Sequence, residues 1–153
     1  MYKKILIPLD GSEISEHALE HLKGIAMDPR ITSIIMLRVA ETPVALYLGS
    51  DHDLEMEAGA KEQAKADANK YLTKIANYLK KKGMNVETVV TDGIPADDIL
   101  NYATENEVDL IIMSTHGRSG ISRWFSGSVA EKVIRHSTVP VLISPPHGSR
   151  SGK

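Results

Sequence analysis

A loop of small and basic residues carries the clearest chemistry in this sequence. Residues 114–128 read Ser-Thr-His-Gly-Arg-Ser-Gly-Ile-Ser-Arg-Trp-Phe-Ser-Gly-Ser. Glycines let the backbone approach a ligand closely, and the free N–H groups at the start of a following helix attract anions. Residues 114–136 contain four Lys or Arg residues against one acid, Glu131, although the whole chain has a net charge of −2. We therefore predict phosphate binding at this loop.

The spacing of the loop matches neither of the two common phosphate motifs. No Gly-x-x-x-x-Gly-Lys-Ser/Thr occurs, and no Gly-x-Gly-x-x-Gly follows the first apolar run. The pattern present is Ser114-x-x-Gly117, nine residues, and then Gly127-Ser128. A structural reading stands beside the functional one, because Ser128 and Glu131 also match a capping box at the start of a helix. Spacing alone leaves both readings open.

The elements that must position this loop alternate regularly along the chain. Apolar runs predict strands at 5–9, 34–40, 86–91, 109–113 and 139–143, and helical spacing predicts helices at 12–27, 55–82, 95–106 and 128–136. Continuous Val, Ile and Leu strands between amphipathic helices indicate an α/β fold, with an open parallel sheet covered by helices on both faces. Ligands of such sheets bind at the carboxyl ends of the strands. Asp10, Val39 and Ser114 follow or end three strands, so we expect them to share one crevice.

Length and composition favour a single-domain protein and argue against a nucleic-acid-binding or membrane-spanning one. The 153 residues suit a single domain over 1–144, followed by a Pro-, Gly- and Ser-rich tail at 145–153 that we expect to be disordered. The small net charge argues against a nucleic-acid partner, and no apolar run approaches the roughly 18 residues of a membrane span. Cysteine is absent, which fits a cytoplasmic protein without disulfides.

Three segments together carry a resemblance to a known family. They are Ile5-Leu6-Ile7-Pro8-Leu9-Asp10-Gly11-Ser12, then Asp109-Leu110-Ile111-Ile112-Met113-Ser114-Thr115-His116-Gly117-Arg118, and finally Gly127-Ser128-Val129-Ala130-Glu131-Lys132-Val133 with Val139-Pro140-Val141-Leu142-Ile143. The chain resembles the universal stress protein family over roughly residues 2–144. In the nucleotide-binding branch of that family the loop reads Gly-x-x-Gly-x9-Gly-Ser/Thr, and Ser114 stands here at the place of the first glycine.

The resemblance implies a fold, a ligand and an assembly. The fold is a Rossmann-like five-stranded parallel sheet with strand order 3-2-1-4-5. The implied ligand is an adenine nucleotide, ATP or its relatives AMP and ADP, accompanied by Mg²⁺ or Mn²⁺, and the implied function is that of a stress-response regulatory protein. The implied nucleotide-binding residues are Pro8, Asp10, Val39, Met113, Ser114, Gly117, Gly127, Ser128 and Val129. The implied assembly is a homodimer formed through strand 139–143, where Pro140 independently indicates a sheet edge or a strand start.

Two other functions are compatible with parts of this sequence. A phosphorylation receiver shares the α/β plan and would use Asp10, Asp92 and Thr115, but no paired acid stands beside Asp10. A homodimeric interaction module that binds no nucleotide is the alternative within the same family. No general base is evident, so we assign no catalytic residue and expect at most slow ATP hydrolysis. His17 and His21 share a helix face without a third ligand, and we interpret them as solvated surface.

Overall fold

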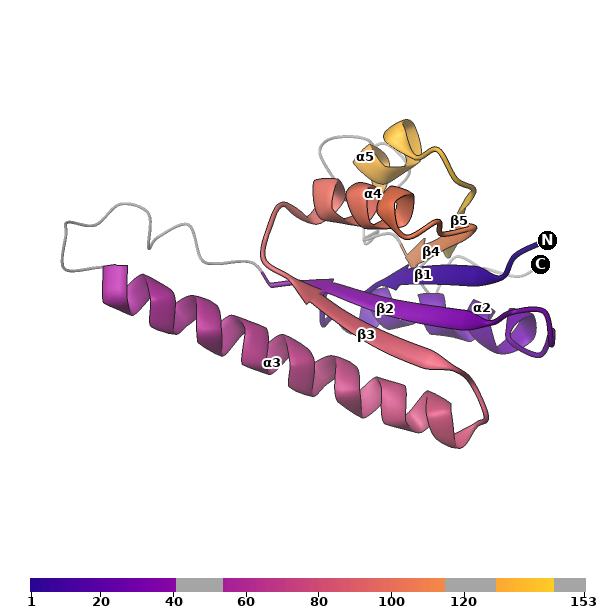
Figure 1. The fold of residues 1–153 in the computed structure, drawn as a ribbon, viewed down its shortest axis with the longest axis horizontal. Helices are drawn as coiled ribbons and strands as arrows, with labels where there is room; N and C mark the ends of the chain where they lie inside the picture. Colours follow the sequence, from indigo (N-terminus) through magenta and orange to yellow (C-terminus); the bar gives the residue numbers. More distant parts are fainter. Residues whose placement is uncertain (41–53, 115–128, 145–153) are drawn as a thin grey trace, which may run out of the picture.

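Strands and helices alternate along the part of the chain that the structure, a computed structural model, describes: residues 1–40, 54–114 and 129–144 (Figure 1). The elements in chain order are β1 Lys4–Pro8, α1 Glu13–Glu16, α2 Ala18–Ile25, β2 Ser33–Val39, α3 Leu54–Lys81, β3 Val86–Thr91, α4 Pro95–Glu105, β4 Leu110–Ser114, α5 Val129–His136 and β5 Val141–Ser144. This order confirms the predicted alternation.

The strands form one parallel sheet with the order β3-β2-β1-β4-β5. β1 lies at the centre, where Leu6 pairs with Ile35 on β2 and with Ile111 on β4. All strands run the same way, so their carboxyl ends meet at one edge. The predicted fold class and strand order are confirmed.

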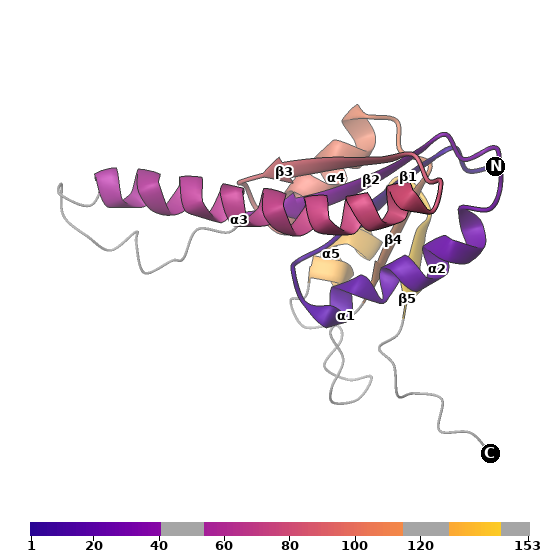
Figure 2. The same ribbon diagram turned by 90° about the horizontal axis from the view of Figure 1, so that it is seen from below.

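Two apolar layers cover the sheet, and side chains of β1 alternate between them. Ile5 and Ile7 pack with Leu72 of α3 and Leu22 of α2, whereas Leu6 packs on the opposite face with α4 and α5. Helices α2 and α3 therefore lie on one face of the sheet, and α4 and α5 lie on the other (Figures 1 and 2). Ile5, Leu6 and Ile7 have no exposed surface, which explains why β1 reads as an unbroken apolar run.

The first predicted helix, 12–27, is divided in two. Helix α1 ends at Glu16 and α2 begins at Ala18. The hydroxyl of Ser15 donates to the carbonyl oxygen of Ser12 at 2.8 Å, and the N–H of Glu20 donates to the carbonyl oxygen of His17, only three residues back. Local hydroxyl-to-carbonyl bonds compete with the regular helical ladder, which accounts for the irregular turn at His17.

The last strand begins later than predicted. The sequence predicts a strand over 139–143, whereas β5 spans Val141–Ser144. The late start of β5 is explained by Ser137. Its hydroxyl donates to the carbonyl oxygen of Val139 and accepts from the N–H of Val139, which holds that residue in a turn. Pro140 has no N–H for the ladder, although its carbonyl oxygen accepts from the N–H of Ile111 at 3.0 Å. β5 forms one edge of the sheet, as Pro140 indicates.

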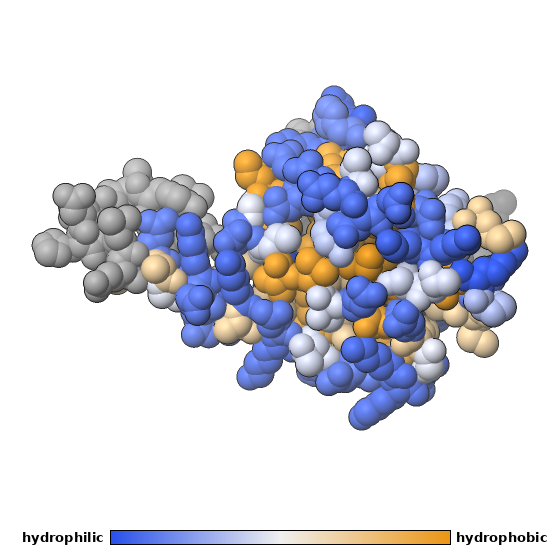
Figure 3. All heavy atoms as spheres, viewed as in Figure 1, coloured by the Kyte–Doolittle hydropathy of each residue, from blue (hydrophilic) through white to orange (hydrophobic). Residues whose placement is uncertain are grey.

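The surface of the described residues carries both hydrophilic and hydrophobic side chains. Figure 3 shows hydrophilic residues over α3 and α4, with hydrophobic residues gathered between these helices where β3 forms the other sheet edge. No helix among the described residues is long and apolar enough to span a membrane. The predicted tail, 145–153, lies outside those residues.

A single carboxylate fixes the amino end of the central strand. Oδ2 of Asp109 accepts from the backbone N–H groups of Lys3 and Lys4 at 2.9 and 2.8 Å, and the N–H of Asp109 donates to the carbonyl oxygen of Lys4. The two N–H donors hold the pKa of Asp109 below its ordinary value. This clamp aligns β1 with the residue that precedes β4.

We predict that Asp109→Asn destabilises the fold by on the order of 1 kcal/mol at pH 7, a value reduced for partial exposure. The pKa of this carboxyl is lowered in the folded state, so its contribution is complete above the ordinary carboxyl pKa of about 3.9 and is lost as the pH falls below it. Urea unfolding between pH 7 and pH 3 measures this. The exposed Glu62→Gln serves as control, and an Asp109 variant as stable as the control at pH 7 contradicts the clamp.

Candidate functional site

Three predicted nucleotide residues lie at the carboxyl ends of neighbouring strands. Pro8 ends β1, Val39 ends β2, and Met113 is the penultimate residue of β4. Met113 belongs to the apolar layer beneath α4 and α5, as do Leu6 and Leu37. Because strand side chains alternate, Pro8 and Val39 point to that same face. The structure thus brings three predicted apolar residues to one edge and one face of the sheet.

The turn after β1 is shaped by Asp10. Oδ1 of Asp10 accepts from the N–H of Ser12 at 2.8 Å and from its hydroxyl at 2.6 Å, and the N–H of Asp10 donates to the hydroxyl of Ser15 at 3.3 Å. An aspartate that bonds the backbone two residues later forms a compact turn. Asp10 remains exposed at the carboxyl edge of the sheet, which is where a ligand would meet it.

Ser114 and Val129 mark the two described ends of the predicted phosphate loop. Ser114 is 6% exposed, is the last residue of β4 and pairs with Ser144 of β5. Glu107 is the only described non-glycine residue with a positive φ, so Ser114 needs no glycine-like backbone. Val129, 37% exposed, begins α5. Gly117, Gly127 and Ser128 lie outside the described residues, as do His116, Trp124 and Phe125.

One buried carboxylate occupies the first turn of α5. Glu131 is 8% exposed, and its Oε1 pairs with Nη2 of Arg135 at 2.8 Å, one turn later. A buried carboxylate requires compensation, and this pairing supplies part of it. The pairing also reduces the repulsion that Glu131 would exert on an anion near the start of α5.

Arg38, the penultimate residue of β2, lies near the carboxyl edge of the sheet and is not among the residues that the sequence predicts for the site. Its Cζ lies 4.9 Å from the centre of the Tyr71 ring, and the Tyr71 hydroxyl donates to Oε1 of Glu16 at 2.9 Å. Burial and that hydrogen bond raise the pKa of Tyr71. The guanidinium also lies against Gly11, in the turn after β1, where an added Cβ would be 2.6 Å from Nη1. These residues are too far apart in sequence to form a recognisable motif.

The chain matches a known protein family over nearly its whole length. The model of the universal stress protein family matches residues 1–145. The chain belongs to the universal stress protein family. Universal stress protein MJ0531 of Methanocaldococcus jannaschii is 33% identical over 94% of this chain and 82% of its own length. Universal stress protein MJ0577 of the same organism is also 33% identical, over 94% of each chain.

Solved structures of universal stress proteins share the fold. The structure of MJ0577 superposes with a TM-score of 0.82 at 32% identity, covering 97% of this chain and 99% of the other. An AMP-bound family member from Arabidopsis thaliana has a TM-score of 0.64 at 15% identity, covering 99% and 96%. A universal stress protein in complex with cAMP has a TM-score of 0.60 at 23% identity, covering 95% and 98%. The last two show likeness of fold alone.

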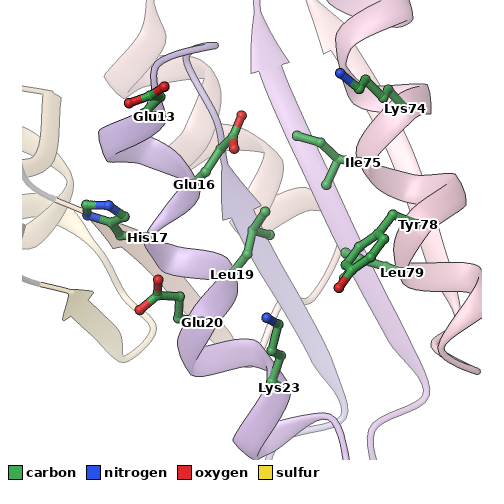
Figure 4. A pocket seen from close by; sticks show the side chains of 10 residues that line it. All are labelled: Glu13, Glu16, His17, Leu19, Glu20, Lys23, Lys74, Ile75, Tyr78 and Leu79. Atoms are coloured by element: carbon green, nitrogen blue, oxygen red, sulfur yellow. The ribbon is translucent and has the colours of Figure 1, made fainter. Parts of the chain in front are cut away.

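A separate groove of about 630 Å³ lies on the other face of the sheet, between α1–α2 and α3 (Figure 4). Leu19 and Ile75 face each other across it. The remaining lining residues are Glu13, Glu16, His17, Glu20, Lys23, Lys74, Tyr78 and Leu79. Of the predicted nucleotide residues, those that the structure describes do not border this groove.

The two histidines of the first helical region differ in exposure. His17 is half-buried and borders the groove, whereas His21 is exposed on α2. Within the ranges that the structure describes, no three His, Asp or Glu side chains gather as a metal site would require.

Gly11 provides a test of the geometry at the turn. Its φ is +88°, and a Cβ there would lie 2.6 Å from Nη1 of Arg38. We predict that Gly11→Ala destabilises the fold by about 1–3 kcal/mol, because alanine disfavours this backbone and would displace the guanidinium. Gly24→Ala is the matched control, since Gly24 lies in α2 with open space around it and should gain about 0.5–1 kcal/mol. Thermal and urea unfolding compare them, and equal effects would refute the argument.

Proposed function

We propose that this universal stress protein binds an adenine nucleotide, with ATP as the preferred form, across the carboxyl ends of β1, β2 and β4. The observation that carries the proposal is the gathering of Pro8, Val39 and Met113 on one face of one sheet edge, with Asp10 and Ser114 beside them. Apolar side chains suit a nucleobase, and the polar residues suit the hydroxyls and phosphates that it carries.

The two ends of the ligand would meet different strands. In this proposal the base lies near Asp10 and Val39, and the phosphates lie on Ser114, Gly117, Gly127 and Ser128. The start of α5 would contribute its positive end, which is worth about 0.3–1 kcal/mol for an exposed anion and up to about 2 kcal/mol for a partly buried one. Val129 would line the site at the first residue of that helix.

Relatives support the class of ligand. One universal stress protein has been solved in complex with cAMP and another with AMP bound, so adenine nucleotides bind to members of the family. Mg²⁺ or Mn²⁺ would enter with the nucleotide and be held chiefly by phosphate oxygens and water. The chain's own described residues offer the Asp10 carboxylate and the Ser114 hydroxyl as further oxygen donors near this edge.

Nucleotide binding fits these residues better than fast ATP hydrolysis or the function of a phosphorylation receiver. Asp92 follows β3 and pairs with Nζ of Lys65 at 2.8 Å, and β2 lies between β3 and the strand that leads to Asp10. The two acids therefore belong to strands that are not neighbours. We propose a regulatory nucleotide-binding protein with at most slow ATP hydrolysis.

We predict that Gly127→Val abolishes ATP binding with little change in the melting temperature of the free protein. A branched side chain would stand where a phosphate must approach the backbone. Calorimetric titration with ATP and Mg²⁺ measures the loss, and Gly24→Ala should bind as the wild type does. Equal ATP binding by wild type and Gly127→Val would refute the site, and no binding by either at millimolar ATP would favour a module that acts without nucleotide.

A homodimer through β5 is our second proposal. β5 is an edge strand whose Val141, Leu142 and Ile143 are only half-buried within one chain. An apolar edge invites pairing with another strand unless it is covered. Pairing with the same strand of a second copy would cover both edges at once, as a two-fold interface does.

We predict that Ile143→Glu converts a dimer into a monomer, because it puts a charge on the apolar edge strand β5 and so opposes the pairing of two such edges. Sedimentation at micromolar concentration measures the mass, and a thermal melt confirms that the variant is folded. Val89→Glu, at a half-buried position of the opposite edge strand β3, is the matched control and should leave the mass unchanged. A wild-type protein that sediments as a monomer contradicts the dimer.

A further inference from the structure

The side chain of Arg38, at the carboxyl edge of the sheet, is positioned by a contact with an aromatic ring. It is the penultimate residue of β2, and its guanidinium stacks over Tyr71 of α3, with 4.9 Å between Cζ and the ring centre. The ring is itself held, since the Tyr71 hydroxyl donates to Glu16 of α1 at 2.9 Å. A cation over an aromatic face is attracted to it. The long side chain is therefore oriented by two helices rather than left to solvent.

The same guanidinium lies against the turn that carries Asp10. A Cβ at Gly11 would be 2.6 Å from Nη1, 2.9 Å from Cζ and 3.0 Å from Nη2 of Arg38. Only a glycine leaves this space open, and its φ of +88° is one that glycine adopts readily. Arg38 consequently reaches from β2 to the turn after β1, next to a predicted ligand residue.

The hydrogen-bonding capacity of Arg38 is unused within the described residues. A guanidinium has five N–H donors in a planar fork. None of them donates to an acceptor in residues 1–40, 54–114 or 129–144, where the contact with Tyr71 engages only the face of the group. Among the described residues the edge of the fork meets no acceptor, so its donors are the groups that a ligand at the end of the sheet would engage.

We propose that Arg38 binds the ribose of the nucleotide, donating to its hydroxyl oxygens, an inference that rests on the function proposed above. Asp10 precedes Gly11 in the same exposed turn, and in this proposal its carboxylate accepts from the ribose O–H groups. Vicinal hydroxyls both donate and accept, so a carboxylate and a guanidinium together match them. A deoxygenated sugar would leave both partners with fewer bonds.

The position of Arg38 favours the sugar over the phosphates. The phosphate loop leaves β4, and β1 lies between β4 and β2. Adjacent strands are about 4.8 Å apart, so the ends of β2 and β4 are separated by roughly 10 Å. Val39, the next residue, turns toward the α4–α5 face while Arg38 turns toward α3. A ligand across the edge would meet Val39 on one side and Arg38 on the other.

The test is a calorimetric comparison of ATP with 2′,3′-dideoxy-ATP, which lacks both ribose hydroxyls. The wild type should prefer ATP by at least about tenfold, the factor that a charge-assisted hydrogen bond supports. Arg38→Ala should lose about tenfold in ATP affinity and little in dideoxy-ATP affinity, so that the preference falls by about that factor and only the part due to Asp10 is left. The control is Arg30→Ala, which removes an exposed arginine paired with Asp28 before the amino end of β2 and should change neither value.

Other outcomes overturn the inference in distinguishable ways. Equal losses for ATP and dideoxy-ATP in Arg38→Ala would mean that Arg38 only supports the turn. Unchanged ATP affinity in that variant would mean that it makes no contact, while nucleotide binding itself would stand. A loss for ATP that is absent for AMP would move the contact to the phosphates. A wild-type protein that binds neither nucleotide would remove the proposed function together with this inference.

Discussion

The parallel pairing of β2, β1 and β4 is the constraint on which the candidate site depends. β1 has a hydrogen-bonded neighbour on each side and apolar layers on both faces, and Ile5, Leu6 and Ile7 have no exposed surface. A parallel sheet places every carboxyl end on the same side. Residues distant in sequence therefore meet at one edge without any contact made specifically to gather them. The Asp109 clamp at the other end of β1 fixes its position relative to β4.

The turn after β1 brings polar groups to the carboxyl edge of the sheet, where the candidate site lies. The chain must leave a buried strand and enter α1 within four residues, Leu9 to Ser12. Asp10 closes the turn with its side chain, and Gly11 supplies the left-handed backbone. The absence of a side chain at Gly11 also leaves room for Arg38. One glycine thus serves both the path of the chain and the approach of a charged group to the sheet edge.

Much of this arrangement follows from the sequence, and the exceptions have local causes. Apolar runs and helical spacing predict the α/β alternation, and the family resemblance supplies the strand order. The break at His17 depends on hydroxyl bonds within 12–16, and the late start of β5 depends on the Ser137 turn, neither of which alters apolar spacing. Arg38 was missed for a different reason. Its role depends on Tyr71 and Gly11, and only the folded chain brings those residues beside it.

A ligand at the edge of a sheet can contact residues from both faces, and in this protein the two faces carry different kinds of side chain. On the α4–α5 side the strand ends present apolar Pro8, Val39 and Met113; on the α3 side Arg38 presents a charge. The difference arises within β2, where neighbouring residues must point oppositely. A nucleoside has the same asymmetry, since its base is flat and weakly polar while its sugar carries hydroxyls. A site that straddles the edge can therefore recognise both parts of a nucleoside with adjacent residues of one strand.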